Sequence, residues 1–170
     1  MMVVVAFVSA MTSCNHKVTL DDAKKAEATL FNADQTVNKD AVPEAMNTFC
    51  QFAEDNPKDS LAPEYMFKAL EVSVNFMEPE KAIEIGNKMF ENYPDYSMTP
   101  VGMFLLASMV YEDKYKDLDK ARELYEKIIN DYPENDFVPS ARQAIKNLGK
   151  TPEELVKEFE QMNDTVQQPE

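Results

Sequence analysis

Residues 117–139 read DLDKARELYEKIINDYPENDFVP, and this stretch predicts how the rest of the chain is built. Its apolar residues recur at steps of three and four positions, which is typical of one face of an α-helix; they are Leu118, Ala121, Leu124, Tyr125, Ile128 and Ile129. The helix is expected to end before Pro133, because a proline ring clashes with the preceding turn and offers no N–H group. Another helix is expected to begin near Pro139, because proline suits the first helical turn.

The same pattern occurs three times, as AMNTFCQFAEDNPKDSLAP from residue 45, AIEIGNKMFENYPDYSMTP from residue 82 and ARELYEKIINDYPENDFVP from residue 121. In each copy an alanine stands 12 residues before a first proline, and a second proline follows 6 residues later. The alanines are Ala45, Ala82 and Ala121, and the first prolines are Pro57, Pro94 and Pro133. The copies are 37 and 39 residues apart. A period in this range predicts a solenoid of helical hairpins.

The repeat resembles the tetratricopeptide repeat (TPR) family, in the form found in bacterial envelope lipoproteins. The resemblance covers residues 21–159 and rests on the alanine, an aromatic residue four positions later and the closing proline. These residues are Ala45, Phe49 and Pro57, then Ala82 and Pro94, then Ala121, Tyr125 and Pro133. The resemblance implies an all-α, right-handed superhelix of about four antiparallel helical hairpins.

Helices are expected at residues 21–31, 42–55, 62–76, 79–92, 99–111, 118–131, 137–148 and 152–162. The segment 99–111 is apolar on nearly every side, which is typical of a helix buried between neighbours. Gly86 takes the aromatic position of the second copy, and we expect a large side chain from this apolar helix to fill the space. The third hairpin has two extra residues, which we expect in the charged turn at residues 112–120. Thr151, Pro152 and Glu154 predict a capping box at the last helix.

The composition favours one helical domain and excludes some classes of partner. The chain has 170 residues, 3 glycines and 10 prolines, and six of those prolines belong to the repeats. Its net charge is −14, so phosphate neutralisation by a basic patch, and with it nucleic-acid binding, is not expected. We interpret the excess of acidic residues as a feature that keeps the protein soluble. The alternative is that it attracts a basic partner.

Residues 1–13, MMVVVAFVSAMTS, suit the apolar region of a secretion signal and are too short to span a bilayer as a helix. Residues 11–14, Met-Thr-Ser-Cys, resemble a bacterial lipobox, which implies cleavage before Cys14 and its lipidation. A basic leader does not precede this run, so either translation starts further upstream or the run is not a signal. The alternative for Cys14 is a chance cysteine on a buried helix.

The expected organisation is a cleaved signal peptide at 1–13, a lipidated tether at 14–20, a TPR-like domain at 21–162 and a disordered tail at 163–170. The expected location is the bacterial cell envelope, with the protein anchored in the outer membrane and facing the periplasm. This placement follows from the resemblance and from Cys14.

Catalytic and metal chemistry finds no support in the sequence. There is a single histidine, His16, and there is no glycine-rich phosphate loop and no cysteine–histidine cluster. We interpret Cys50 as a small buried apolar residue, because a reactive thiol requires an electropositive setting. We therefore expect no enzymatic activity, no cofactor and no metal.

The function expected from these features is a non-enzymatic scaffold for protein–protein interaction. In the TPR family the first helix of each hairpin lines a concave groove that receives a peptide or a partner helix. Counting helical phase, we expect the groove to be lined by Tyr65, Lys68, Val72, Asn75, Leu105, Met109 and Glu112. Two alternatives stay open: a soluble cytosolic TPR adaptor, and an enzyme or carrier with a site in the groove.

Overall fold

The computed structural model describes residues 17–166, apart from the side chains at 159 and 162–166. Within this range the chain is all-α, with an isolated β-bridge between Phe31 and Val37. The helices are α1 (Leu20–Thr29), α2 (Val42–Asp55), α3 (Ala62–Phe76), α4 (Pro79–Asn92), α5 (Thr99–Leu105), η1 (Leu106–Lys114), α6 (Leu118–Asp131), α7 (Val138–Asn147) and α8 (Pro152–Val166). The predicted all-α class is confirmed for this part of the chain.

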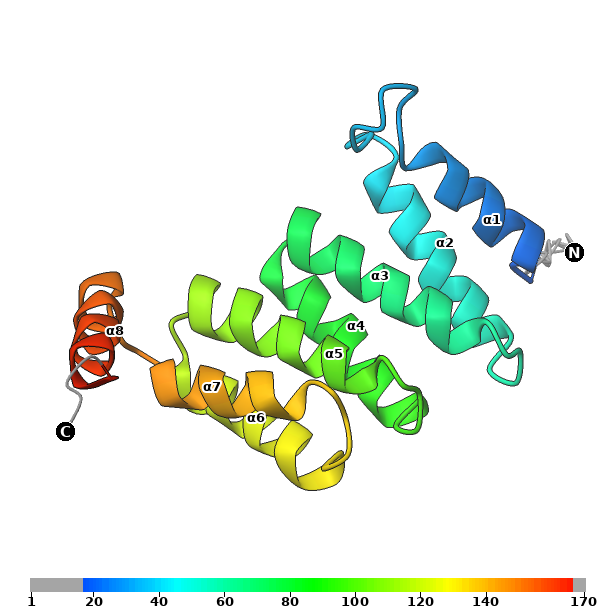
Figure 1. Cartoon of the computed structure of the whole chain (residues 1–170). Helices are drawn as coiled ribbons and strands as arrows, with labels where there is room; N and C mark the ends of the chain where they lie inside the picture. Colours follow the sequence, from blue (N-terminus) through cyan, green and yellow to red (C-terminus); the bar gives the residue numbers. More distant parts are fainter. Residues whose placement is uncertain (1–16, 167–170) are drawn as a thin grey trace, which may run out of the picture.

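The helices form a row of hairpins (Figure 1). Helix α2 packs against both α1 and α3, α3 packs against α4, and α6 packs against α5, η1 and α7. The continuous helix formed by α5 and η1 also contacts α3 and α4. The three hairpins α1–α2, α3–α4 and α5/η1–α6 therefore pack on one another in chain order, and α7 covers the last of them. The fourth predicted hairpin does not form a packed pair, because α8 stands apart from α7 (Figure 1).

The repeat prolines stand at equivalent places in the helices. Pro63, Pro100 and Pro139 occupy the first turn of α3, α5 and α7, where a missing N–H costs no helical hydrogen bond. The residues before the closing prolines are Asn56, Tyr93 and Tyr132, with φ between −129° and −133° and ψ between 51° and 54°. These angles lie outside the helical region, as expected for a residue that precedes proline.

The same three residues tie each hairpin to the preceding part of the chain. Asn56 Nδ2 donates a hydrogen bond to the Val18 carbonyl (2.8 Å). The Tyr93 hydroxyl donates to the Ala53 carbonyl (3.1 Å), and the Tyr132 hydroxyl donates to the Pro94 carbonyl (2.9 Å). Each bond joins residues 38 or 40 positions apart, which is about one repeat. We call these three hydrogen bonds the inter-repeat ties.

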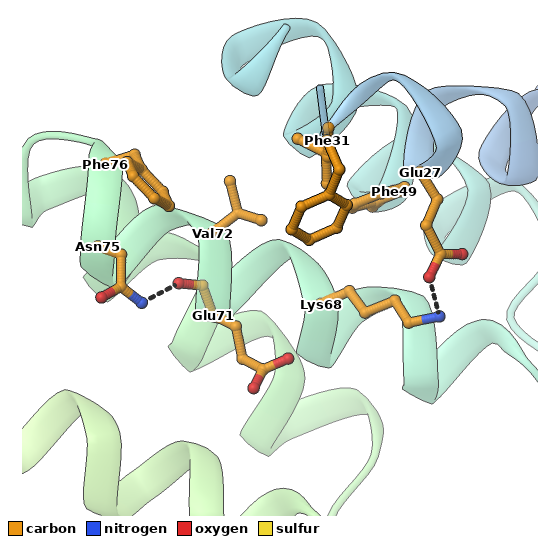
Figure 2. Close-up of a pocket in the computed structure, with 9 residues that line it drawn as sticks. Glu27, Phe31, Phe49, Lys68, Glu71, Val72, Asn75 and Phe76 are labelled. Atoms are coloured by element: carbon orange, nitrogen blue, oxygen red, sulfur yellow. Dashed lines mark hydrogen bonds and ion pairs between the residues drawn. The ribbon is translucent and has the colours of Figure 1, made fainter. Parts of the chain in front are cut away.

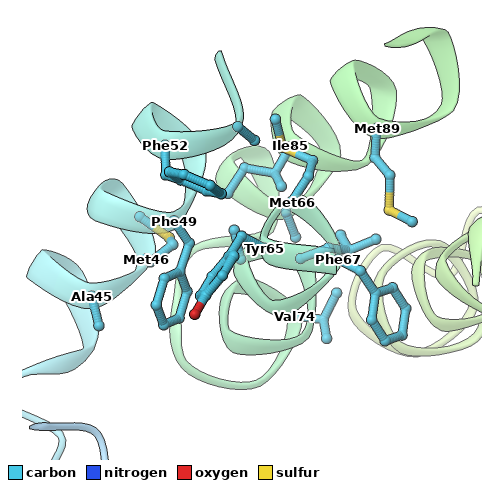
Figure 3. Packing of buried hydrophobic residues seen from close by; sticks show 14 of the residues in the cluster. Ala45, Met46, Phe49, Phe52, Tyr65, Met66, Phe67, Val74, Ile85 and Met89 are labelled. Carbon is cyan, nitrogen blue, oxygen red and sulfur yellow. The ribbon is translucent and has the colours of Figure 1, made fainter. Parts of the chain in front are cut away.

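The repeat alanines mark the crossings between helices. Ala45, Ala82 and Ala121 are fully buried, as are the nearby aromatic side chains of Phe49 and Tyr125. Figure 3 shows part of this packing between α2, α3 and α4. Small side chains at these positions let the helix axes approach closely.

The space beside Gly86 is filled as predicted. A Cβ atom built at Gly86 would lie 3.0 Å from the Leu106 Cδ2 atom, which belongs to η1. The Leu70 side chain of α3 is the other aliphatic neighbour, at 3.6 Å. Leu106 of the central apolar helix therefore fills part of the space left by the missing aromatic side chain, together with the Phe90 ring of α4, whose Cζ atom would lie 3.5 Å from that Cβ.

The predicted end of the central helix at residue 111 is wrong. The helix continues as η1 to Lys114, and the amide of Tyr115 donates to the carbonyl of Val110, five residues earlier, at 2.9 Å. Because π-helical turns close over five residues, this segment accommodates one extra residue. The other extra residue lengthens the link at 115–117, so the charged turn is shorter than the predicted 112–120.

The last helix begins as predicted and ends later. The Thr151 amide donates to Glu154 Oε2 (2.8 Å), and the Glu154 amide donates to Thr151 Oγ1 (3.2 Å), which is the predicted capping box. Helix α8 continues to Val166, into the stretch predicted as a disordered tail, because no glycine or proline interrupts it before Pro169. Residues 167–170 lie outside the described part.

Helix α8 stands apart from the rest of the row in Figure 1. The buried apolar side chains form two core clusters, a larger one over α1–α4 that includes Leu106 and Val110, and a smaller one over α6 and α7 that includes Met103 and Ala107. Neither cluster includes a described side chain of α8. An ion pair between Lys150 and Glu158, at 2.7 Å, holds its first turns to the preceding link. None of the helices between residues 17 and 166 is long and apolar enough to cross a membrane.

Candidate functional site

A hollow of about 320 Å³ opens between α1 and α3, and we call it the α1–α3 hollow. Its lining comes from α1, the turn that follows α1, one residue of α2 and one face of α3. These residues are Glu27, Leu30, Phe31, Phe49, Lys68, Glu71, Val72, Asn75 and Phe76. Figure 2 shows the rings of Phe31 and Phe76 on either side of Val72, with the charged residues towards one side.

Two phenylalanines are presented to solvent at this hollow. The exposed fractions of Phe31 and Phe76 are 58% and 42%, high values for large apolar side chains. Phe31 is held by its bridge to Val37 and by a hydrogen bond from the Asn38 amide to the Leu30 carbonyl, at 2.8 Å. These interactions fix the backbone at Phe31 before any ligand arrives, which reduces the entropy lost on binding.

The turn after Phe31 is itself held together by side chains. The Asp34 carboxylate accepts hydrogen bonds from the Thr36 hydroxyl (2.7 Å) and the Thr36 amide (3.0 Å). These bonds lower the pKa of Asp34. Gln35 occupies the left-handed region at φ 66°, which lets the chain reverse tightly towards Val37.

The one lysine of the hollow is already paired. Lys68 Nζ lies 2.8 Å from Glu27 Oε1 and 2.8 Å from Glu64 Oε1, and 4.7 Å from the centre of the Tyr65 ring. Burial alone would lower the pKa of Lys68, but the hydrogen bonds to Glu27 and Glu64 outweigh this effect and raise it. Two carboxylates therefore share one ammonium group.

Glu71 is the other carboxylate that lines the hollow. Its side chain has no ion-pair partner among the described residues, and burial raises its pKa, while Lys68 opposes the shift. Among the lining residues, Glu27 and Glu71 outnumber Lys68, and Glu64 beside the hollow shares the same lysine, so the rim carries an excess of negative charge. The α1–α3 hollow thus combines an apolar floor, two exposed aromatic rings and an acidic rim.

The structure brings together three of the predicted groove residues, namely Lys68, Val72 and Asn75. Tyr65 does not line the hollow, since it is only 3% exposed and its ring packs 5.4 Å from that of Phe49. Helix α2 covers this end of α3, so only the Tyr65 hydroxyl reaches the rim, where it donates to Glu27 at 3.2 Å.

The other predicted groove residues, Leu105, Met109 and Glu112, do not line the hollow. Leu105 and Met109 are half-buried against the larger core cluster. Glu112 accepts a hydrogen bond from the Tyr125 hydroxyl of α6, at 3.1 Å. These three residues belong to the helix formed by α5 and η1, whereas the hollow is lined only by α1, the turn after it, α2 and α3.

Phe31, Phe76 and Glu71 were missed by sequence reasoning. Phe31 and Phe76 stand at the ends of predicted helices, where an apolar residue is normally assigned to the core. The signal that could have found them is position: each is the last residue of its expected helix. Apolar side chains at such ends are less easily covered by the next helix.

Cys50 is a free thiol in the described part of the chain, and it is half-buried in α2. Burial raises the pKa of the Cys50 thiol to about 11, which keeps it protonated and unreactive near neutral pH. Among residues 17–166, apart from the omitted side chains, no group of three carboxylates, thiols or imidazoles lies close enough to hold a metal ion. Cys14 and His16 lie outside the described residues.

The fold and the site together define an all-α chain of packed hairpins with an apolar, acidic-rimmed hollow. Comparison with known proteins adds no relative: no family model, no curated protein and no solved structure matches this chain.

Proposed function

We propose that this protein is a non-enzymatic TPR-type scaffold, anchored by a lipid on Cys14 to a membrane of the bacterial cell envelope, which binds a partner protein at the α1–α3 hollow. The observation that carries the binding role is the pair of exposed rings, Phe31 and Phe76, over an apolar floor. Contiguous apolar surface of this kind, bordered by polar residues, is typical of a binding site.

The proposal of a TPR-type right-handed superhelix is supported by the regularity of the repeats. The buried alanines recur, and so do the backbone angles before the closing prolines; each of these hairpins also has one inter-repeat tie, although the donor and acceptor groups differ. Repetition of one contact pattern along a chain rotates each hairpin by a similar step, and this produces a superhelix.

The proposed anchor is supported by the residues at 11–14 and by how the chain is held just after them. The Val18 amide donates to Asp55 Oδ2 at 2.8 Å, and the Val18 carbonyl accepts from Asn56. Val18 follows Cys14 by four positions in the chain, a span of at most roughly 14 Å. A lipid on Cys14 would therefore hold the first hairpin close to the membrane surface.

Site-specific photo-crosslinking in the native cells tests the binding role. A benzophenone side chain would replace Asn75, an exposed residue of the hollow, and in a control variant Glu126, an exposed residue of α6. A defined crosslinked partner is expected at residue 75 only, and Phe31→Ala should abolish it. Equal crosslinking at both positions, or a product indifferent to Phe31→Ala, would argue against the hollow as the binding site.

Mass spectrometry of the mature N-terminus, from fractionated cells, tests the anchor. The wild type should carry a diacylglyceryl group on Cys14 in the membrane fraction, and Cys14→Ala should lose it. An unmodified N-terminus in the soluble fraction would refute the anchor and favour the cytosolic adaptor, while the fold would be unaffected.

A further inference from the structure

We infer that the occupant of the α1–α3 hollow is a basic peptide segment, in which one or two bulky apolar side chains are flanked by lysine or arginine. This inference rests on the proposed function, since it names the chemistry of the partner at the same site. It is carried by the size of the hollow, by its charges and by the placing of its aromatic rings.

The size of the hollow fits side chains better than a cofactor. Its volume of about 320 Å³ is near the lower end of the range, roughly 300–1,000 Å³, of small-molecule sites. Leu30, Phe49 and Val72 supply an apolar floor with no polar group fixed deep inside it. Such a floor accepts a leucine or an aromatic ring but offers no hydrogen bonds to orient a polar ligand.

The charges of the rim select a cationic neighbour. An acidic ligand would have to displace Glu27 or Glu64 from Lys68, because both carboxylates are already bound to it. A basic ligand meets Glu71, which has no ion-pair partner among the described residues and lies beside the floor residue Val72. The net charge of −14 also attracts a basic segment from a distance.

The aromatic rings favour the same chemistry. Phe31 and Phe76 present open faces on either side of the floor (Figure 2). A lysine or arginine side chain can lay its aliphatic stem against such a ring and place its cation over the face. A second copy of this acidic chain is a poor occupant by comparison, because two net charges of −14 repel each other.

Peptide titrations followed by NMR chemical shifts test this inference. The probes are three short acetylated peptides with the same Leu-Phe-Leu centre, flanked by two lysines, two serines or two glutamates. At about 0.01 M salt the lysine peptide should bind roughly fivefold more tightly than the serine peptide, and the glutamate peptide should bind least. Glu71→Gln should remove most of the difference between lysine and serine.

Matched variants separate the hollow from general charge attraction. Glu126→Gln removes an equivalent exposed charge on α6 and should leave the preference unchanged. Phe31→Ala and Phe76→Ala should weaken all three peptides, whereas Val156→Ala, at an equally exposed apolar residue of α8, should weaken none.

The outcomes distinguish the preference for a basic peptide from the proposed docking role of the α1–α3 hollow. Equal affinity for the three peptides, with loss in Phe31→Ala, would overturn the basic preference and leave the hollow as a docking site. No binding at the hollow by any peptide, together with no crosslinked partner at residue 75, would overturn both. Shifts at Val72 produced by dodecyl maltoside, but by no peptide, would assign the hollow to an acyl chain and overturn the inference.

Discussion

The tyrosines before the closing prolines contribute to stability through single hydrogen bonds between hairpins. We expect Tyr93→Phe to lower the free energy of unfolding by about 0.5–1.5 kcal/mol, the net value of such a bond. Tyr132→Phe should cost less, because its tie to Pro94 is exposed whereas that of Tyr93 is partly buried. Urea denaturation of the two variants measures both values.

Tyr96→Phe is the matched control for this prediction. Tyr96 is half-buried, as Tyr93 is, but its hydroxyl makes no hydrogen bond among the described residues. Removing it should leave the free energy of unfolding nearly unchanged. A loss at Tyr96 as large as that at Tyr93 would mean that the inter-repeat ties do not add stability.

Cys50 should react slowly and with an unusual dependence on pH. Because burial raises its pKa to about 11, its thiolate fraction at neutral pH is on the order of a hundredfold below that of an exposed cysteine. The rate of reaction with a disulfide reagent, in a Cys14→Ser background, should rise steadily with pH up to about 11. A rate in the folded protein equal to that in guanidinium chloride would contradict this prediction.

The helix bounds show how much of the fold follows from local sequence. Helices α2, α3, α4 and α6 begin and end at the predicted residues. Their ends are set by proline, by Asp117 as the cap of α6 and by apolar periodicity, all of which act within a few residues. The π-helical segment was missed because its hydrogen-bond pattern depends on how η1 packs between α4 and α6.

Helix α8 depends on its cap more than the other helices do. Since none of its described side chains belongs to a core cluster, local interactions supply most of its stability. Thr151→Ala removes one side of the capping box and should cost about 1 kcal/mol. We expect faster hydrogen exchange in α8 alone, with no change in the urea midpoint of the whole protein.

The same measurement on Thr48→Ala provides a contrast. Thr48 lies within α2 and donates its hydroxyl to the Glu44 carbonyl, so it caps no helix end. This change should leave exchange in α8 untouched. Protection of α8 that survives Thr151→Ala would mean that contacts with the rest of the row, rather than the cap, hold the helix.

The candidate site is a property of the whole molecule, and the sequence predicted only the part that lies on one helix. Lys68, Val72 and Asn75 share a face of α3, so helical phase was enough to group them. Phe76 lies on the same helix, four residues after Val72, and was left out because an apolar residue at a helix end was assigned to the core. Phe31 joins them only because the turn after α1 folds back through the bridge to Val37. No regular spacing in the sequence indicates that Phe31 lies beside this face of α3.

Stability should be divided unequally between the two core clusters, which meet at the central helix. Leu106 and Val110 pack into the larger cluster with α1–α4, whereas Met103 and Ala107 pack into the smaller one with α6 and α7. In a row of hairpins each unit depends mainly on its neighbours. Opening of α6 and α7 should therefore precede loss of α1–α4.

Two fully buried isoleucines test this order. Ile128→Ala in α6 should cost about 2–5 kcal/mol locally and expose the amides of α6 and α7 to hydrogen exchange, while α2 and α3 stay protected. Ile85→Ala in α4 removes a side chain of the same size from the larger cluster and should speed exchange throughout residues 42–141, because the central helix loses its support. If both variants speed exchange equally in all helices, the two clusters unfold as one unit and this division of stability is wrong.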